Sequence, residues 1–444
     1  MNNINIVILS FAFIFAYLCK KSIIPKISIM NYLKFKPLNY FVLAFVIIFV
    51  SLFLSCKSKE DPAPIPNLPP LTFNVAASLS TNGQDVILRW NKSKDPEGDV
   101  VTYAVVYKDT LVKNLSDTTY TIKNLPFDTE IKGTVVAKDT KGNKTVSLFT
   151  IQTISEYVTI PDENFEKYLI TLKIDDVFDG KVLRKNIISI TSLNVQSETK
   201  SDNNKIKSLV GIESFVSIKK LFCHGNLISN LDLSKSNALT DLNCSSNKLL
   251  NLDLSSNINL QLLNCGSNPF TTLNLSKNIE LTSLSLGGTN MKNFDISKNI
   301  NLKYFECATN NFSNIDVSNN VSLTTLICID NKLSSLDISK NTALTYLDCD
   351  INELFNLDIS KNVSLRYLSC VNNRLFSLDV SKNVPLTFLY ISYNLLQELD
   401  IRKNINLGYL DCTDNNIRTI CVNNLNQVTQ NWEKDPTATY KVCP

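Results

Sequence analysis

Residues 239–259 read LTDLNCSSNKLLNLDLSSNIN, and this stretch decides the fold of the chain. Its first half follows the pattern L-x-x-L-x-C-x-x-N-x-L, and its second half, from Leu249, nearly repeats it as L-x-x-L-x-L-x-x-N. The same 21-residue pattern recurs through residues 218–420. Its cysteine position is occupied by Cys223, Cys244, Cys265, Leu286, Cys307, Cys328, Cys349, Cys370, Ile391 and Cys412. A fixed period of this kind predicts about ten stacked repeats, because one repeat cannot bury its leucine face alone.

Both halves of the repeat carry a short alternating apolar segment, which is typical of a brief strand. We expect the first strand on the concave face of the stack and the second strand on the opposite face. The motif resembles leucine-rich repeat proteins over about half of the chain, specifically the 21-residue nested repeats of internalin-like bacterial surface proteins. This resemblance implies a mainly β fold, in which the repeats form a parallel-stranded solenoid or horseshoe.

The amino-terminal region is apolar and lightly basic. Lys34 and Lys36 precede the apolar run FVLAFVIIFVSLFLS at residues 41–55, which ends at Cys56. A basic region followed by an apolar core of this length predicts a secretory signal. The final Phe-Leu-Ser-Cys resembles a bacterial lipobox, which implies that Cys56 becomes the acylated first residue of an outer-membrane or cell-surface lipoprotein. An uncleaved membrane anchor is the alternative interpretation.

Residues 1–55 together form the predicted signal or leader region. A second apolar run at residues 4–18 precedes Met30, and Met30 opens a complete signal peptide by itself. We therefore expect the true start at Met30; two membrane segments are the alternative, although residues 4–18 are short for a span. Residues 56–68 are polar and rich in proline, which predicts an extended tether.

Residues 69–155 change to a pattern of short strands, in which apolar and polar residues alternate between turn-forming residues. About seven strands at this spacing predict a β-sandwich. Trp90, Tyr103 and the segments 125–129 and 135–139 resemble fibronectin type III domains. We expect this domain to act as a spacer, because a fold alone does not define a function.

Two segments flank the repeats and are predicted to cap them. Residues 156–217 contain a helix start at Pro161, since proline and acidic residues suit a first helical turn. This segment resembles the cap that precedes such repeats in related surface proteins. The period fails in residues 421–444, where we predict a disulfide between Cys421 and Cys443 because exported proteins can form such bonds.

Two kinds of polar residue also recur with the period. An asparagine side chain can bond main-chain groups of a neighbouring turn, so we expect its column to hold tight bends. This column contains Asn226, Asn247, Asn268, Asn310, Asn331, Asn352, Asn373, Asn394 and Asn415, with Thr289 in the remaining turn. On the far face, aspartates recur at positions 232, 253, 295, 316, 337, 358, 379 and 400, and lysines follow three residues later in most repeats. Those two columns predict charge compensation on a solvated face.

Several metal sites are disfavoured by the sequence. Asp175 and Asp179 fit ligand positions of a calcium loop, but Asn186 stands at the twelfth position, where a bidentate glutamate is required. We therefore predict a simple turn at Asp179. A straight column of cysteines cannot supply four tetrahedral ligands to zinc, so the ladder cysteines are predicted to be free, buried hydrophobes. We predict no metal and no cofactor.

Residues that flank the leucine and cysteine of each first strand face the concave surface. Aromatic and acidic residues gather there in the carboxy-terminal half, which is common at recognition surfaces. We predict that these residues bind a ligand: Tyr304, Tyr346, Asp348, Tyr367, Phe388, Tyr390, Tyr409 and Asp411. The rings would supply flat apolar surface. The alternative is that tyrosine merely suits a strand.

The chain offers little support for catalysis or nucleic-acid binding. Its formal net charge is +3 with both signs interspersed, whereas nucleic-acid binding needs a clustered basic face. His224 is the one histidine, and an acid pair such as Asp348 with Glu306 lacks any sign of a pocket. We predict a surface-anchored, non-enzymatic binding or adhesion protein that engages a protein or glycan at the cell surface. The alternative is a structural envelope or spacer protein without a dedicated ligand.

Overall fold

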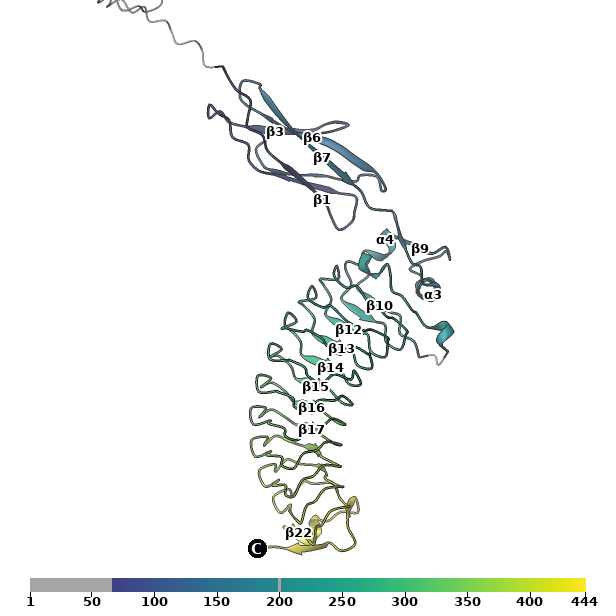
Figure 1. Cartoon of the computed structure of the whole chain (residues 1–444), viewed down its shortest axis with the longest axis vertical. Helices are drawn as coiled ribbons and strands as arrows, with labels where there is room; N and C mark the ends of the chain where they lie inside the picture. The colour runs from purple at the N-terminus through teal and green to yellow at the C-terminus, as the bar shows by residue number, and fades with distance from the viewer. Residues whose placement is uncertain (1–65, 199–200) are drawn as a thin grey trace, which may run out of the picture. The chain divides into compact units, whose positions relative to one another are not determined.

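A computed structural model describes residues 66–198 and 201–444, so the predictions for Cys56 and the leader lie outside the described residues. The fold is mainly β: a solenoid of about 11 turns at about 21-residue spacing follows small antiparallel sheets (Figure 1). Buried apolar side chains form two separate cores, one in the small sheets and one that runs along the solenoid. Among the described residues, no helix is long and apolar enough to cross a membrane.

The segment predicted as a sandwich forms two antiparallel sheets. The strands are β1 (Val75–Leu79), β2 (Val86–Trp90) and β5 (Thr119–Ile122) in one sheet, and β4 (Asp109–Leu115), β3 (Thr102–Tyr107), β6 (Glu130–Lys138) and β7 (Lys144–Gln152) in the other. Tyr103 is buried at the centre, where its ring meets Phe73 and Trp90 edge-on and its hydroxyl accepts a hydrogen bond of 2.7 Å from the Ser93 N–H. A buried tyrosine thus keeps its polar end satisfied.

A small cap of mixed structure precedes the solenoid. It contains β8 (Tyr157–Thr159), α3 (Glu163–Thr171), β9 (Lys181–Leu183) and α4 (Arg184–Ile187). Asp162 caps α3 by accepting hydrogen bonds from the backbone N–H groups of Asn164 and Phe165, both at 3.0 Å. These bonds satisfy donors that the first helical turn leaves free.

The segment that we predicted as a turn rather than a calcium loop is held by a buried carboxylate. Glu166 of α3 accepts hydrogen bonds from the backbone N–H groups of Asp179 at 2.7 Å and Gly180 at 2.6 Å. Gly180 has a φ of 77°, a left-handed conformation that glycine adopts without strain. Among the described residues, no group of three or more His, Cys, Asp and Glu side chains could hold a metal ion.

One long parallel sheet forms the concave side of the solenoid, and each rung contributes about three residues (Figure 1). Its strands are β10 (Ser192–Asn194), β11 (Lys220–Phe222), β12 (Asp241–Asn243), β13 (Leu262–Asn264), β14 (Ser283–Ser285), β15 (Tyr304–Glu306), β16 (Thr325–Ile327), β17 (Tyr346–Asp348), β18 (Tyr367–Ser369), β19 (Phe388–Tyr390), β21 (Tyr409–Cys412) and β23 (Trp432–Lys434). The register places each leucine opposite the next, as Leu242 lies opposite Leu263. The sheet begins at β10 and ends at β23, so it extends into both segments predicted as caps.

The prediction of a second strand in each repeat was wrong for most of the solenoid. Among the described repeats it forms only at β20 (Glu398–Asp400) and, one repeat later, at β22 (Thr419–Val422). β20 pairs with β22, which in turn pairs with β24 (Thr439–Val442). In earlier repeats, side chains take the place of the backbone ladder. For example, Asn257 Nδ2 donates hydrogen bonds to the carbonyls of Leu233 at 3.1 Å and Ser236 at 2.9 Å.

The predicted asparagine column holds the bends at the end of each first strand. Asn373 shows the pattern, because its Nδ2 donates to the carbonyls of Cys349 at 3.0 Å and Cys370 at 3.2 Å while its Oδ1 accepts from the Leu354 N–H at 3.0 Å. The side chain therefore links main-chain groups of adjacent turns in the buried core. Thr289 replaces it in one turn and uses its hydroxyl to reach Leu286 O and Asn310 Oδ1.

A second asparagine column, which we did not recognise in the sequence, lines the far side of the core. Its members are fully buried and each donates from Nδ2 to two carbonyls of the preceding turn. The column consists of Asn257, Asn278, Asn299, Asn320, Asn341, Asn362, Asn383 and Asn404. The signal was present in the sequence, since these residues also recur every 21 positions.

The aspartates of the far face act as turn caps rather than as partners of the lysine column. Asp253 Oδ1 accepts a hydrogen bond of 2.9 Å from the Ser255 N–H, and the other aspartates repeat this contact. Such bonds hold the pKa of Asp253 below its ordinary value. In the described part of the chain, no ion pair joins the aspartate column to the lysine column; Asp400 pairs instead with Arg402 at 2.8 Å. The lysines nevertheless compensate the charge through space: hydrogen bonds from Ser297 are the main cause that lowers the pKa of Asp295, and attraction to Lys298 adds to it, as attraction to Lys340 does for Asp337.

The eight ladder cysteines are buried and unpaired. Burial raises their thiol pKa values, for example that of Cys244 to about 12, so the thiols stay protonated and unreactive. Cysteines on adjacent rungs point the same way along the column, which does not suit a disulfide. Thiol counting on the unfolded, unreduced segment from residue 69 onward should therefore report eight free thiols. A count of zero would contradict this geometric argument.

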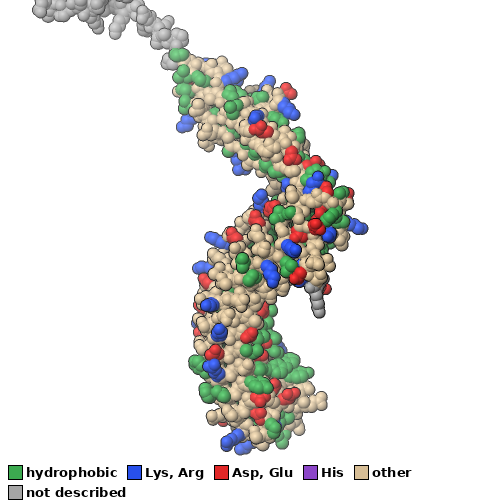
Figure 2. Space-filling view, turned by 45° about the vertical axis from the view of Figure 1, so that its right-hand side comes forward, with side chains coloured by type: hydrophobic (Ala, Val, Ile, Leu, Met, Phe, Trp, Pro, Cys, Tyr) green, Lys and Arg blue, Asp and Glu red, His purple; other side chains and the backbone are tan. Residues whose placement is uncertain are grey.

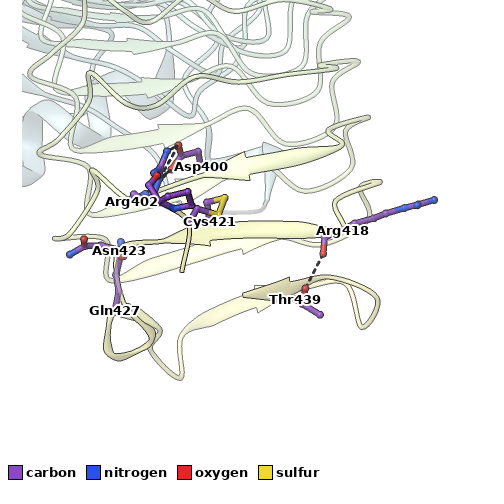
Figure 3. Close-up of a disulfide and its surroundings, with 9 residues drawn as sticks. Asp400, Arg402, Arg418, Cys421, Asn423, Gln427 and Thr439 are labelled. Atoms are coloured by element: carbon purple, nitrogen blue, oxygen red, sulfur yellow. Dashed lines mark hydrogen bonds and ion pairs between the residues drawn. A yellow bond between two sulfur atoms is a disulfide. The ribbon is translucent and has the colours of Figure 1, made fainter. Parts of the chain in front are cut away.

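The carboxy-terminal cap closes the open end of the core (Figure 3). Cys421 of β22 forms a disulfide with Cys443, with the two Cα atoms 5.4 Å apart. Gln427 Nε2 donates to the carbonyls of Ile401 at 2.9 Å and Asn404 at 3.1 Å, and so takes over the role of the second asparagine column. Glutamine carries the same amide group as asparagine, with one more methylene group between the amide and the backbone.

Candidate functional site

The aromatic residues selected from the sequence form one continuous column on the concave sheet. β17, β18, β19 and β21 place Tyr346, Tyr367, Phe388 and Tyr409 in register on adjacent rungs. Tyr390 is the last residue of β19, two positions after Phe388. Its ring packs on the rings of Tyr367 and Phe388, with centroid distances of 5.7 and 6.5 Å. These five residues are called the aromatic cluster below. In the view of Figure 2, hydrophobic and acidic side chains gather toward the carboxy-terminal end of the solenoid.

The rings of the aromatic cluster stack on one another. The centroids of Tyr346 and Tyr367 lie 4.1 Å apart with 4° between the ring planes, and those of Phe388 and Tyr409 lie 4.8 Å apart with 9° between the planes. Strand spacing in a sheet imposes this distance on aligned side chains. In each of these two pairs the rings cover one face of each other, whereas Tyr367 and Phe388 meet at 6.0 Å with a tilt of 40°. A ligand would therefore meet mainly ring edges and hydroxyl groups between the two ends of the column. This geometry differs from the flat surface that we expected.

Tyr304 stands apart from the cluster. Thr325 separates it from Tyr346 in the register, and among the described residues its ring contacts no other ring. The structure therefore brings together four of the selected aromatic positions on consecutive rungs, with Tyr390 beside them, but leaves Tyr304 alone. Ser283 lies on its other side in the same column.

Two carboxylates lie directly beside the aromatic cluster. Asp348 is 7% exposed, and its Oδ1 accepts a hydrogen bond of 3.3 Å from the Asp350 N–H. Asp350 Oδ1 accepts from Ser369 Oγ at 2.6 Å and from the Val371 N–H at 2.7 Å. Burial raises the pKa of Asp348 to about 6, and the negative charge of Asp350 adds to the rise. Burial also raises the pKa of Asp350.

These carboxylates have no basic partner within the described residues. No ion pair there includes Asp348, Asp350 or Asp411; Asp411 instead accepts hydrogen bonds from the Thr413 N–H at 3.1 Å and its hydroxyl at 2.7 Å. Burial, with help from the nearby acids, raises the pKa of Tyr346, which therefore keeps its proton at neutral pH. The site thus offers negative charge, phenol donors and aromatic edges on one face.

One acidic residue of this site was missed in the selection from the sequence. Asp350 follows Asp348 by two residues, so the strand period places both on the same face. The predicted disulfide residues Cys421 and Cys443 lie at the end of the solenoid, away from the strands of the aromatic cluster in the register. His224 follows β11 at the other end of the sheet.

Comparison with known proteins places the fold. No protein-family model matches the sequence, and no curated protein matches it. A solved structure described as the functional domain of InlJ from Listeria monocytogenes, which includes a cysteine ladder, is 32% identical with a TM-score of 0.58. The match covers 65% of this chain, and the chain spans 63% of the length of that structure. This likeness, with the register described above, shows an internalin-like leucine-rich repeat solenoid.

Two further structures are more distant. The internalin InlF from Listeria monocytogenes is 19% identical with a TM-score of 0.48, over 64% of this chain and 96% of that one. A structure named FN3tt mut is 19% identical with a TM-score of 0.15, over 18% of this chain and 91% of that one. These values decide nothing further, so the fibronectin type III assignment of the sandwich stays a prediction.

Proposed function

We propose that this chain is a cell-surface-tethered, non-enzymatic binding protein that engages another protein through its concave face. The observation that carries the proposal is the pairing of the aromatic cluster with carboxylates that lack basic partners. Stacked ring faces leave little room for a sugar ring to pack, whereas tyrosine edges and carboxylates suit a protein surface that presents lysine or arginine. The likeness to the functional domain of InlJ supports a role for the solenoid itself.

Charge favours a basic partner. A positive charge that a ligand brings to a desolvated carboxylate is attracted more strongly than at the open surface, because the local dielectric constant is low. Asp348 and Asp350 lie in such surroundings because their desolvation already raises their pKa values. A lysine or arginine of the partner would offset that cost, and Asp411 would set the orientation of the partner along the cluster.

Removing two rings at the centre of the cluster should weaken binding of such a partner at least about tenfold, because each anchoring ring contributes on the order of 1–2 kcal/mol. The variant is Tyr346→Ala with Tyr367→Ala, measured against a partner identified by probing protein and glycan arrays with the segment from residue 69 onward. The matched control is Phe355→Ala with Phe376→Ala, which removes two exposed rings outside the concave strands. Undiminished binding by the cluster variant would place the binding site outside the cluster, and loss on altering the sandwich would move the site there. Failure to find any partner on the arrays would favour the spacer alternative.

We also propose that the protein is anchored by lipid on Cys56 and that residues 69–155 act as a fibronectin type III-like spacer. The support is the signal pattern that ends at Cys56 and the proline-rich tether that follows it. Intact mass spectrometry of the membrane-extracted protein should find a chain that begins at an acylated Cys56. A chain that retains residues 41–55 would rule out this anchor.

A further inference from the structure

A second concave region, separate from the aromatic cluster, is hollow, with a mainly polar lining in one part and a mainly apolar lining in the other. Small residues gather at this place: Ser283 and Ser285 lie on β14, and Gly266 and Gly287 follow the ends of β13 and β14. Two hollows of about 370 and 300 Å³ result, and they share Asn264 and Ser285 in their lining. The chain has 11 glycines in all, and Gly266, Gly287 and Gly288 line the first hollow. The missing side chains therefore leave a continuous depression on the concave face.

A carboxylate is held in fixed geometry at the edge of this depression. Glu306 Oε1 accepts a hydrogen bond of 2.9 Å from the Ala308 N–H, and Oε2 accepts from Ser285 Oγ and, at 3.4 Å, from the Gly287 N–H. A Cβ atom on Gly287 would lie 2.3 Å from Glu306 Oε1. Glycine at position 287 is therefore what allows the carboxylate to lie there, and charge-assisted bonds of this kind keep it in place.

The rest of the lining offers donors and an aromatic face. Asn243 and Asn264 each use Oδ1 to accept a local hydrogen bond, from the Ser245 N–H at 3.2 Å and the Gly266 N–H at 3.3 Å. Within the described residues, neither amide nitrogen donates a hydrogen bond, so both can donate to a ligand. Tyr304 closes one end of the smaller hollow, and no other described ring covers its faces.

We propose that this depression binds one or two sugar units of a neutral glycan. A pair of neighbouring hydroxyls would donate to Glu306 and accept from the Asn264 amide, which matches the donors and acceptors of a diol. The apolar face of the sugar ring would pack on Tyr304, which, unlike the stacked rings of the aromatic cluster, has no ring neighbour among the described residues and lies between Ser283 and Thr325 in the register. The site is independent of the proposed protein-binding function, because it uses other rungs of the sheet.

The test uses the full chain in a zwitterionic detergent that contains no sugar. Saturation-transfer NMR would be recorded with neutral trisaccharides of glucose, galactose, mannose and N-acetylglucosamine, and with trigalacturonate as a charged comparison. We expect at least one neutral trisaccharide to bind and trigalacturonate not to bind, because its carboxylates would meet Glu306. If no neutral trisaccharide binds, or if trigalacturonate binds equally well, the proposal is overturned.

Variants then assign the binding to these residues. Glu306→Ala should weaken trisaccharide binding about tenfold or more, since it removes a charge-assisted hydrogen-bond acceptor. Gly287→Ala should act similarly because it displaces the same carboxylate, and Tyr304→Ala serves as a further variant that removes the ring at the other end of β15. The double variant Tyr346→Ala with Tyr367→Ala is the control and should bind as the wild type does. Normal binding by all three site variants, or loss of binding in the control, would place the sugar elsewhere and overturn the proposal.

Discussion

Replacing Asn373 with leucine should lower the free energy of unfolding by about 4 kcal/mol. The change leaves the Leu354 N–H and the Cys349 carbonyl in the core without the amide that they share, and each buried unpaired group costs about 1–3 kcal/mol. The remaining cost comes from fitting a branched apolar side chain among main-chain groups. Urea denaturation followed by circular dichroism measures the difference.

Asn301 provides the matched control for this prediction. Its Nδ2 donates a hydrogen bond of 3.1 Å to the Ile279 carbonyl, but this contact is exposed to solvent. Water replaces an exposed partner, so Asn301→Ala should cost less than about 1 kcal/mol. If Asn373→Leu costs no more than Asn301→Ala, the asparagine column does not hold the turns together.

Replacing Asp348 with asparagine should stabilise the protein by about 2–3 kcal/mol at pH 7.5. Burial raises the pKa of Asp348 from 3.8 to about 6, so between pH 4 and 6 the folded state keeps a proton that the unfolded state has lost. Stability contributed by this group is therefore present below pH 4, falls as the pH rises through this window and is lost above it. Asparagine keeps the acceptor for the Asp350 N–H without the buried charge, and two pKa units correspond to about 3 kcal/mol.

The gain should disappear when the measurement is repeated at pH 4, since both side chains are then neutral in the folded state. Asp358→Asn is the matched control, because Asp358 lies on the far face and its bond from the Ser360 N–H holds its pKa below the ordinary value. That variant should bring no gain at pH 7.5. A protein partner should bind Asp348→Asn more weakly, so stability and binding should change in opposite directions. Equal stability of Asp348→Asn and wild type at both pH values would contradict the argument.

Much of the solenoid could be predicted from the sequence, because a period of 21 residues reports directly on stacking. The leucines and the ladder cysteines recur at positions that the rungs bury, and the alternation around Cys349 places Asp348 and Tyr346 on the concave side of the sheet. Periodicity also indicated the first asparagine column. In each of these cases a residue at one position of the repeat contacts the residue at the same position of the next repeat, 21 residues along the chain. The sequence pattern therefore shows the contact directly.

The second strands, the aspartate caps, the ring stacking and the Glu166 contact depend on interatomic distances, which a repeating sequence pattern does not report. The second segment of each repeat alternates like a strand, but strands form there only at β20 and β22 among the described repeats, and asparagine amides such as that of Asn257 link the earlier turns. The far-face aspartates lie three residues before lysines, but their carboxylates accept hydrogen bonds from serine N–H groups only two residues away. Ring stacking in the aromatic cluster depends on side-chain rotamers, and Glu166 acts on a loop 13 residues away.

The one-sided ladder of the solenoid has a mechanical consequence. Each turn is joined to the turn before and the turn after by rungs on one side and by asparagine amides on the other. A pulling force along the stack would therefore peel turns from an end one at a time, and each turn of 21 residues would release about 70 Å of chain. The disulfide between Cys421 and Cys443 spans 22 residues and keeps the last turn closed under such a load. A chain pulled from its two ends would thus lengthen in steps and absorb work one turn at a time.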